Sequence, residues 1–280
     1  MGILFHTMAT PEFDLTEAAN LSSRLGFDGI ELICQAGYQC GLDPDAAIED
    51  ARKLGLELRQ LGAPVRVLSA YEKRIADHDE SIREFAVRRL SRSITLAAAL
   101  GATRVRVLAG EEVSADDWSG ALDRLTSSLR QLAAIAGEYG VMLLVENHMD
   151  TMATSAAKTV SICEATGCDN VRILFDPANL ATLGAEDFLQ GFRSQRDWIA
   201  HVHVKDAIVD HGGRRSVVPG EGGGPWPALF AEIQASGYRG DFAIEYERRW
   251  LPELPAAEDA LPRAMLFIER YLTEGRRAEI

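Results

Sequence analysis

Four short, mainly apolar runs of this sequence carry an ionisable residue at or near their ends: Glu146, Asp176, His203 and Glu245. Three carboxylates and one imidazole form a ligand set that suits a divalent cation of intermediate hardness. We expect Mn²⁺, with Mg²⁺, Co²⁺ or Zn²⁺ as alternatives. If the three acids converged without a cation between them, they would repel one another and raise each other's pKa. The residue types therefore predict one divalent metal site.

The run around His203 has a polar side chain at every second position. Successive side chains of a β-strand point to opposite faces, so His201, His203 and Lys205 share one face. We expect His203 to bind the metal and His201, one layer deeper, to support the site. Lys205 and His148, which lies two residues after Glu146, are expected either to contact substrate hydroxyl groups or to line a solvated rim.

The elements that must carry these residues alternate between strand and helix. Helical stretches end in a glycine six times, each followed by a β-rich run, and a glycine just past a helix closes its last turn. These glycines are Gly26, Gly62, Gly101, Gly140, Gly167 and Gly237. The predicted strands are Ile3 to His6, Gly29 to Ile33, Val65 to Ala70, Thr103 to Leu108, Val141 to Asn147, Val171 to Asp176, Ala200 to Lys205 and Asp241 to Tyr246. Strand followed by helix about eight times predicts an α/β protein of the single (β/α)8 TIM-barrel class, in which functional residues gather at the carboxyl ends of the strands.

The spacing of the predicted ligands agrees with that class. Glu146 and Asp176 are 30 residues apart, Asp176 and His203 are 27, and His203 and Glu245 are 42. Each step is about one βα unit, and the last is lengthened by the glycine-rich segment 210–224. Because the sequence shows no domain boundary, we expect residues 1–280 to form one domain.

Composition limits the classes of partner. The formal charge is −13 and the pI is near 5.0, which disfavours nucleic acid or an anionic membrane, because phosphate backbones bind mainly Lys and Arg. The four cysteines have neither a close-paired zinc spacing nor the density of a disulfide scaffold. There is no signal-peptide pattern and no run of the roughly 18 apolar residues that a membrane span needs. These features predict a cytoplasmic protein with a small-molecule partner, and they leave a homo-oligomer open.

Several motifs together resemble the sugar isomerase/epimerase superfamily of xylose isomerase-like TIM barrels, which includes ketose 3-epimerases, hydroxypyruvate isomerases and inosose dehydratases. The motifs are Gly29-Ile-Glu31-Leu, Val-Glu146-Asn-His148, Phe-Asp176-Pro-Ala-Asn179-Leu, His201-Val-His203-Val-Lys205-Asp206, Pro219-Gly220-Glu221-Gly222 and Gly240-Asp-Phe-Ala-Ile-Glu245-Tyr-Glu. The resemblance implies that Glu146, Asp176, His203 and Glu245 are the metal ligands and that Glu146 and Glu245 are the catalytic acid/base pair.

One position departs from the family pattern. Ketose epimerases typically carry a histidine three residues after the aspartate ligand, where this sequence has Asn179. An asparagine can still hydrogen-bond a substrate hydroxyl, so we keep Asn179 as a substrate-binding residue. Arg215, in the glycine-rich segment, is the candidate for a substrate carboxylate. The glycines from Gly220 to Gly224 are not followed by Lys-Ser/Thr and include an acid, so they do not form a P-loop.

The expected reaction is proton transfer beside a carbonyl. A metal chelated by a substrate carbonyl and its neighbouring hydroxyl would stabilise an enediolate, while glutamates remove and return the proton. We therefore predict an isomerase or epimerase of a non-phosphorylated keto-sugar or a related polyol ketone. A lyase is the alternative, either like inosose dehydratase or β-eliminating on a 3-keto-glycoside, because it shares the same first step. A non-catalytic sugar-binding barrel is a further alternative.

Overall fold

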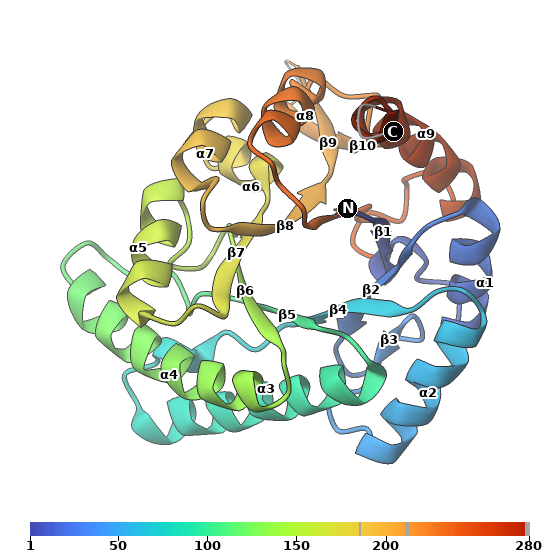
Figure 1. Cartoon of the computed structure of the whole chain (residues 1–280). Coiled ribbons are helices and arrows are strands. Elements are labelled where there is room, and N and C mark those ends of the chain that lie inside the picture. Colours follow the sequence, from blue (N-terminus) through green and yellow to red (C-terminus); the bar gives the residue numbers. More distant parts are fainter. Residues whose placement is uncertain (185, 211–212, 278–280) are drawn as a thin grey trace.

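Eight parallel strands close into a barrel with helices on its outside (Figure 1). The structure is a computed structural model that describes residues 1–184, 186–210 and 213–277. The barrel strands are β1 (Ile3–His6), β2 (Gly29–Cys34), β4 (Val65–Ala70), β5 (Arg104–Val107), β6 (Met142–Glu146), β7 (Val171–Phe175), β8 (Ile199–Val204) and β11 (Asp241–Ile244). The barrel closes because β1 pairs with both β11 and β2. The predicted TIM barrel is confirmed, and its strands agree with the predicted ones to within one or two residues at each end.

Helices follow the strands and cover the outside of the barrel. They are α1 (Leu15–Leu25), α2 (Ile48–Gln60), α3 (Glu80–Leu100), α4 (Trp118–Glu138), α5 (Ala156–Thr166), α6 (Pro177–Thr182), α7 (Phe188–Gln195), α8 (Trp226–Ala235) and α9 (Ala257–Arg277), with short 3-10 turns η1 (Thr7–Ala9) and η2 (Arg74–Ala76). Local sequence sets their ends: Asp14 and Glu17 form a capping box at the start of α1, and Gly26 ends that helix in the left-handed conformation. No helix in the described ranges is long and apolar enough to cross a membrane.

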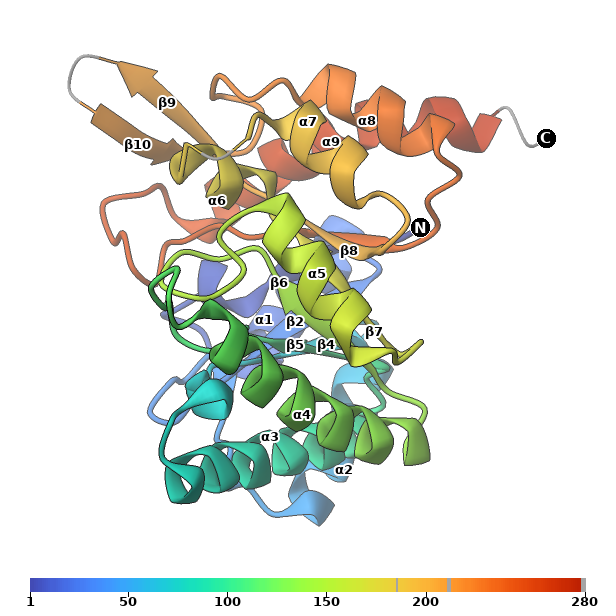
Figure 2. The ribbon, with the colours of Figure 1, turned by 90° about the vertical axis from the view of Figure 1, so that its left-hand side faces the viewer.

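The connection between β8 and α8 is more structured than the sequence suggested. Part of the predicted glycine-rich segment folds into an antiparallel hairpin of β9 (Asp206–Asp210) and β10 (Gly213–Val217), which stands out from the barrel (Figure 2). A short strand, β3 (Gly41–Leu42), extends the sheet beside β2. The hairpin begins directly after Lys205, so its base lies beside the ends of the barrel strands.

The interior of the barrel has an apolar layer beneath a polar one. Leu4, Val67, Leu144, Leu174 and Ala243 form a buried apolar cluster. Two residues further along their strands the same face carries His6, Ser69, Glu146, Asp176 and Glu245, all of them buried. Side chains alternate along a strand, so one register puts apolar residues below and ionisable residues at the carboxyl ends.

The opposite end of the barrel has an ion-pair network of its own. Asp241, at the start of β11, is buried and lies 2.7 Å from Arg104 and 3.0 Å from Arg66. Its carboxylate also accepts a hydrogen bond from the backbone N–H of Gly2. This carboxylate supports the amino-terminal end of the barrel and is separated by the length of β11 from the residues described next.

Candidate metal centre

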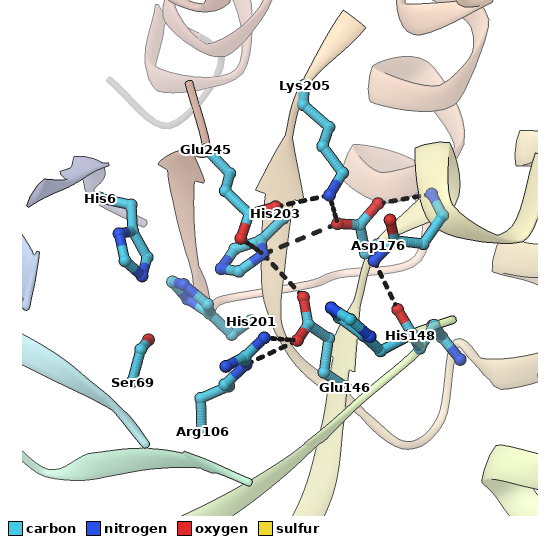
Figure 3. Close-up of polar contacts among 12 residues, drawn as sticks. His6, Ser69, Arg106, Glu146, His148, Asp176, His201, His203, Lys205 and Glu245 are labelled. Atoms are coloured by element: carbon cyan, nitrogen blue, oxygen red, sulfur yellow. Dashed lines mark hydrogen bonds and ion pairs between the residues drawn. The ribbon is translucent and has the colours of Figure 1, made fainter. Parts of the chain in front are cut away.

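The four residues predicted as ligands meet at the carboxyl end of the barrel (Figure 3). Glu146, Asp176, His203 and Glu245 each offer one ligand atom, and these atoms all lie within 4.8 Å of one another. His203 Nδ1 lies 3.3 Å from Glu146 Oε1, 3.7 Å from Asp176 Oδ2 and 3.4 Å from Glu245 Oε1. Residues up to about a hundred positions apart therefore surround one point, with His203 Nδ1 as their common neighbour.

Glu146 uses one carboxylate oxygen for an ion pair and leaves the other facing His203. Arg106, on β5, donates from Nε to Glu146 Oε2 at 2.6 Å and from another guanidinium nitrogen to the backbone oxygen of Ala70 at 3.1 Å. The guanidinium also stacks on the ring of Tyr71, 4.6 Å from its centroid. Burial opposes ionisation of Glu146, but Arg106, His203 and His148 together outweigh burial and lower the pKa of this carboxyl to about 2.

Asp176 divides its two oxygens in a similar way. Oδ1 accepts the backbone N–H of Asn179 at 2.8 Å and caps the first turn of α6. Oδ2 faces His203 and lies 2.8 Å from Lys205 Nζ. Asp176 can therefore cap α6 and bind a metal at the same time, because each function uses a different oxygen.

Lys205 joins two of the candidate ligands. Its Nζ lies 2.6 Å from Glu245 Oε2, in addition to its contact with Asp176. Burial opposes the lysine charge, but Asp176 and Glu245 outweigh burial and raise the pKa of Lys205 well above its usual value. Burial likewise disfavours the Glu245 anion, yet His203 and Lys205 hold the pKa of Glu245 well below its usual range. The two glutamates are thus anionic, as metal ligands must be.

The donor set fits a divalent ion. Glu146 Oε1 and His203 Nδ1 are buried and form no hydrogen bond of good geometry. Ligand atoms about 2.0–2.2 Å from one ion are roughly 3.0 Å apart at neighbouring octahedral positions and roughly 3.4 Å apart in a tetrahedral site. His203 Nδ1 lies 3.3 Å from Glu146 and 3.4 Å from Glu245, which is close to these spacings. Buried polar atoms without partners are costly, so an ion at this point would satisfy groups that the protein leaves unpaired.

A family model described as "Xylose isomerase-like TIM barrel" matches residues 19–271. The chain belongs to this family. Among curated relatives, an inosose dehydratase of Lacticaseibacillus casei is 31% identical over 148 residues, which is 48% of this chain and 48% of the relative. The chain thus spans about half the length of the curated inosose dehydratases that it matches.

Solved structures of the xylose isomerase-like fold superpose over nearly the whole chain. A structure titled L-ribulose 3-epimerase has a TM-score of 0.81 and 22% identity, and covers 99% of this chain and 96% of that chain. The structure of an IOLI protein with a bound zinc atom has a TM-score of 0.77 and 17% identity, and covers 98% of this chain and 99% of that chain. At these levels of sequence identity, the two structures show only that the fold is shared.

Of the predicted substrate-binding residues, three lie beside the cluster and one lies apart. Lys205 contacts two of the ligands, and the partly buried His148 follows Glu146 at the end of β6 (Figure 3). Asn179 is buried and donates from Nδ2 to the backbone oxygen of Asn147 at 2.9 Å. Arg215 is exposed on β10, where it lines a cavity of about 550 Å³.

One acidic residue, Glu247, lies between that cavity and the cluster. Glu247 also lines the cavity, accepts a hydrogen bond from Ser216 at 3.0 Å and lies 3.6 Å from Lys205 Nζ. Arg215 is therefore a wall residue of a neighbouring cavity and is not part of the buried cluster.

The sequence did not predict the roles of several residues that lie around and beneath the cluster. Glu31 and Arg106, which strand parity alone does not assign to a role, are buried and contact candidate ligands. Ser69 and Tyr71 were not singled out. Strand parity places Ser69 on the face of β4 that points into the barrel, and Tyr71 follows directly after the end of that strand.

The Arg106–Glu146 pair gives a first test. Arg106→Met removes the cation and leaves the Glu146 carboxylate buried without its partner. Breaking a buried ion pair in this way costs about 3–5 kcal/mol, so we expect a loss of that size in the free energy of unfolding, measured by urea denaturation in chelating buffer. The matched control is Arg263→Met, which breaks the half-exposed pair with Glu221 and should cost about 0–1 kcal/mol. Similar small losses in both variants would contradict the assignment.

Proposed function

We propose that this protein is a divalent-metal-dependent isomerase or epimerase of a non-phosphorylated keto-sugar or a related polyol ketone. The observation that carries the proposal is the pair of glutamates: Glu146 and Glu245 come from different strands, yet each presents one oxygen to His203 Nδ1, at 3.3 Å and 3.4 Å. Two carboxylates that flank one point can act on two sides of a substrate carbon held there.

Glu146, Asp176, His203 and Glu245 would hold the ion. A divalent ion bound there polarises a carbonyl and stabilises the negative charge that its oxygen gains when a neighbouring proton leaves. Mn²⁺ suits the three-carboxylate set best, and the zinc in the IOLI structure supports a divalent ion on this scaffold.

The glutamates would move the proton. One carboxylate removes a proton from the carbon beside the carbonyl, and the other returns a proton to the opposite face, which inverts that carbon. If a single carboxylate moved the proton between two neighbouring carbons instead, the result would be aldose–ketose isomerisation. Lys205 keeps Glu245 anionic and holds both Glu245 and Asp176 in place. It can donate a hydrogen bond to a substrate hydroxyl from the same position.

The glycine-rich loop supports a substrate without a phosphate group. TIM barrels often bind phosphate with loops after the last two barrel strands and a helix N-terminus. Here the backbone N–H groups of Gly220, Gly222 and Gly224 donate to the carboxylate of Asp206 at 3.1, 3.0 and 3.2 Å. A Cβ on Gly222 would lie 2.2 Å from that carboxylate, so the loop closes tightly on Asp206. The amides that could cradle a phosphate are therefore used by the protein itself.

Polar side chains around the cluster suit a polyhydroxylated substrate. We assign Lys205, His148 and Asn179 to substrate hydroxyl groups, because they lie beside the candidate ligands, just past β8, just past β6 and on α6. Arg215 would contact a part of the substrate that extends into the cavity beside Glu247.

A dehydratase is the second candidate, because inosose dehydratases are among the relatives with 31% identity. Elimination of water begins with the same proton removal, so the cluster suits both reactions. Small-molecule carbohydrates are the expected substrates in either case.

Analysis of products in D₂O separates the candidates. The Mn²⁺-loaded protein is incubated with a panel of ketoses, inososes and 3-keto-glycosides, and the products are examined by mass spectrometry and NMR. We expect an isomer of one substrate, with deuterium at the carbon next to the carbonyl. A product lighter by one water would establish the dehydratase instead. No change in any substrate, with metal bound, would speak against both and favour a binding protein.

A further inference from the structure

Beneath the candidate metal centre, one buried carboxylate contacts two histidines of the same strand. Glu31, on β2, has no exposed surface. Its Oε2 lies 2.8 Å from His201 Nε2, and its Oε1 lies 3.0 Å from His203 Nε2. Ser69 on β4 donates its hydroxyl to Oε1 at 2.5 Å. Glu31 thus connects three strands across the interior of the barrel, although 172 residues separate it from His203.

Glu31, His201 and His203 lie close enough together to be considered a second metal site. Their distances argue against it. Separations of 2.8 Å and 3.0 Å between a ring nitrogen and a carboxylate oxygen are ordinary lengths for N–H···O hydrogen bonds. Both oxygens of Glu31 are already engaged, and Oε1 has two partners. This group is therefore a layer of hydrogen bonds and not a site for an ion.

The two nitrogens of His203 face different surroundings. Nε2 faces Glu31 at hydrogen-bond distance, whereas Nδ1 faces the carboxylates of Glu146, Asp176 and Glu245 at 3.3–3.7 Å. A ring nitrogen that binds a metal must offer a lone pair, and the tautomer that provides it is set by the hydrogen bond of the other nitrogen. A carboxylate without a proton can only accept, so opposite Glu31 the hydrogen must be on Nε2.

We propose that Glu31 is the positioning residue of the metal centre: it holds the hydrogen of His203 on Nε2, fixes the ring, and so presents Nδ1 to the ion. The proposal rests on the metal site put forward under the proposed function and adds a residue that touches neither metal nor substrate. His201 and Ser69 complete the arrangement, because their hydrogen bonds hold the Glu31 carboxylate in the orientation that His203 requires.

A carboxylate suits this position better than a neutral acceptor. Glu31 accepts three hydrogen bonds in all, and an ionised carboxylate has enough lone pairs for them. A glutamine has the same shape, but its amide nitrogen only donates, so it cannot accept from both histidines. Glu31→Gln should therefore release one histidine while changing the volume of the barrel interior very little.

The test measures two quantities: the affinity of the protein for Zn²⁺, and the NMR signal of the hydrogen on His203 Nε2. Zn²⁺ affinity is measured by competition with a chelating dye, and the imidazole N–H protons are observed by NMR on protein with ¹⁵N-labelled histidine. His203→Gln identifies the His203 signal. We expect wild-type protein to show a His203 Nε2–H proton protected from solvent exchange, with and without Zn²⁺. In Glu31→Gln we expect that signal to be lost or strongly shifted and Zn²⁺ to bind about 10–100-fold more weakly.

Two further variants make the result decisive. Asp241→Asn neutralises a buried carboxylate at the other end of the barrel, so it should leave both the Zn²⁺ affinity and the His203 signal unchanged even if it lowers stability. If Glu31→Gln does not fold, Glu31→Asp keeps the charge but shortens the reach to His203, and the same two changes are expected. An unchanged His203 Nε2–H signal and unchanged affinity in the folded Glu31 variant would overturn the proposal. Failure of the wild-type protein to bind Zn²⁺ would instead reject the metal site, and the metal-free spectrum would still test the bond from His203 to Glu31.

Discussion

Glu245→Gln is expected to lower kcat by about 10²–10⁴-fold, the usual contribution of a general acid or base. The glutamine keeps the size of the side chain and can still accept a hydrogen bond from Lys205, which lies 2.6 Å from Glu245 Oε2. It cannot take up a proton, because the amide is not a base near neutral pH. Lys205 keeps Asp176 as a partner at 2.8 Å, so the fold should persist. The measurements are kcat on the substrate found in the D₂O panel and the far-ultraviolet circular dichroism spectrum.

Because Glu245 is also a candidate ligand, its two roles must be separated. Metal content is therefore measured in the same preparations by elemental analysis. A variant that keeps its metal but loses turnover identifies Glu245 as the group that moves the proton, whereas loss of both assigns it mainly to metal binding. Asp241→Asn, which alters another buried carboxylate of the same strand, serves as the control and should keep its turnover. Wild-type kcat in Glu245→Gln would refute the catalytic assignment.

The fold was predictable because its signals are local. A glycine after a helix and an apolar run after that glycine mark each βα joint, and α1 shows the physical basis, with Asp14 capping its start and Gly26 ending it. The β9–β10 hairpin was not predicted. Its strands are only five residues each, and β10 carries two adjacent arginines after its first glycine, so no regular alternation of apolar and polar residues indicated a pair of strands.

The candidate ligands were predictable for a related reason, and their neighbours were not. Strand parity places His201, His203 and Lys205 on one face, and the ends of parallel strands meet at one edge, so convergence of the four ligands follows from topology. Parity does not say which side chains meet across the interior. The contact between Glu31 and His203 depends on how strongly the strands are staggered around the closed barrel, and no local pattern encodes that stagger.

The partners of the ligands explain how a buried acidic cluster is kept in place. Arg106 faces Glu146, Lys205 bridges Asp176 and Glu245, and Glu31 supports His203, so each candidate ligand has one contact that orients it and one atom directed at the common point. This division keeps the site assembled before any ion arrives. Preorganisation of that kind favours binding, because the ligands need not be gathered from separate places.

Removal of the metal is expected to abolish turnover. His203 is the most informative residue here: burial opposes its charge, but Glu245 and Glu31 outweigh burial and raise the pKa of His203 well above its usual value. A proton on Nδ1 and a metal ion compete for the same lone pair. In chelated protein the proton should occupy that position, which keeps the cluster folded but leaves no Lewis acid for a substrate carbonyl. Activity is measured after dialysis against EDTA and again after addition of Mn²⁺, Mg²⁺, Co²⁺ or Zn²⁺, with Mn²⁺ expected to restore it best.

Stability provides an independent measure of the same site. An ion that binds only the folded protein raises the free energy of unfolding by about 2.7 kcal/mol at a free concentration of a hundred times its Kd. We expect the chelated protein to gain this amount when Mn²⁺ is added, with one ion bound per chain. His203→Ala should bind much less Mn²⁺ and show no such gain, because Nδ1 is the nitrogen that all three carboxylates face. Full turnover of protein that contains no detectable divalent metal would exclude the mechanism.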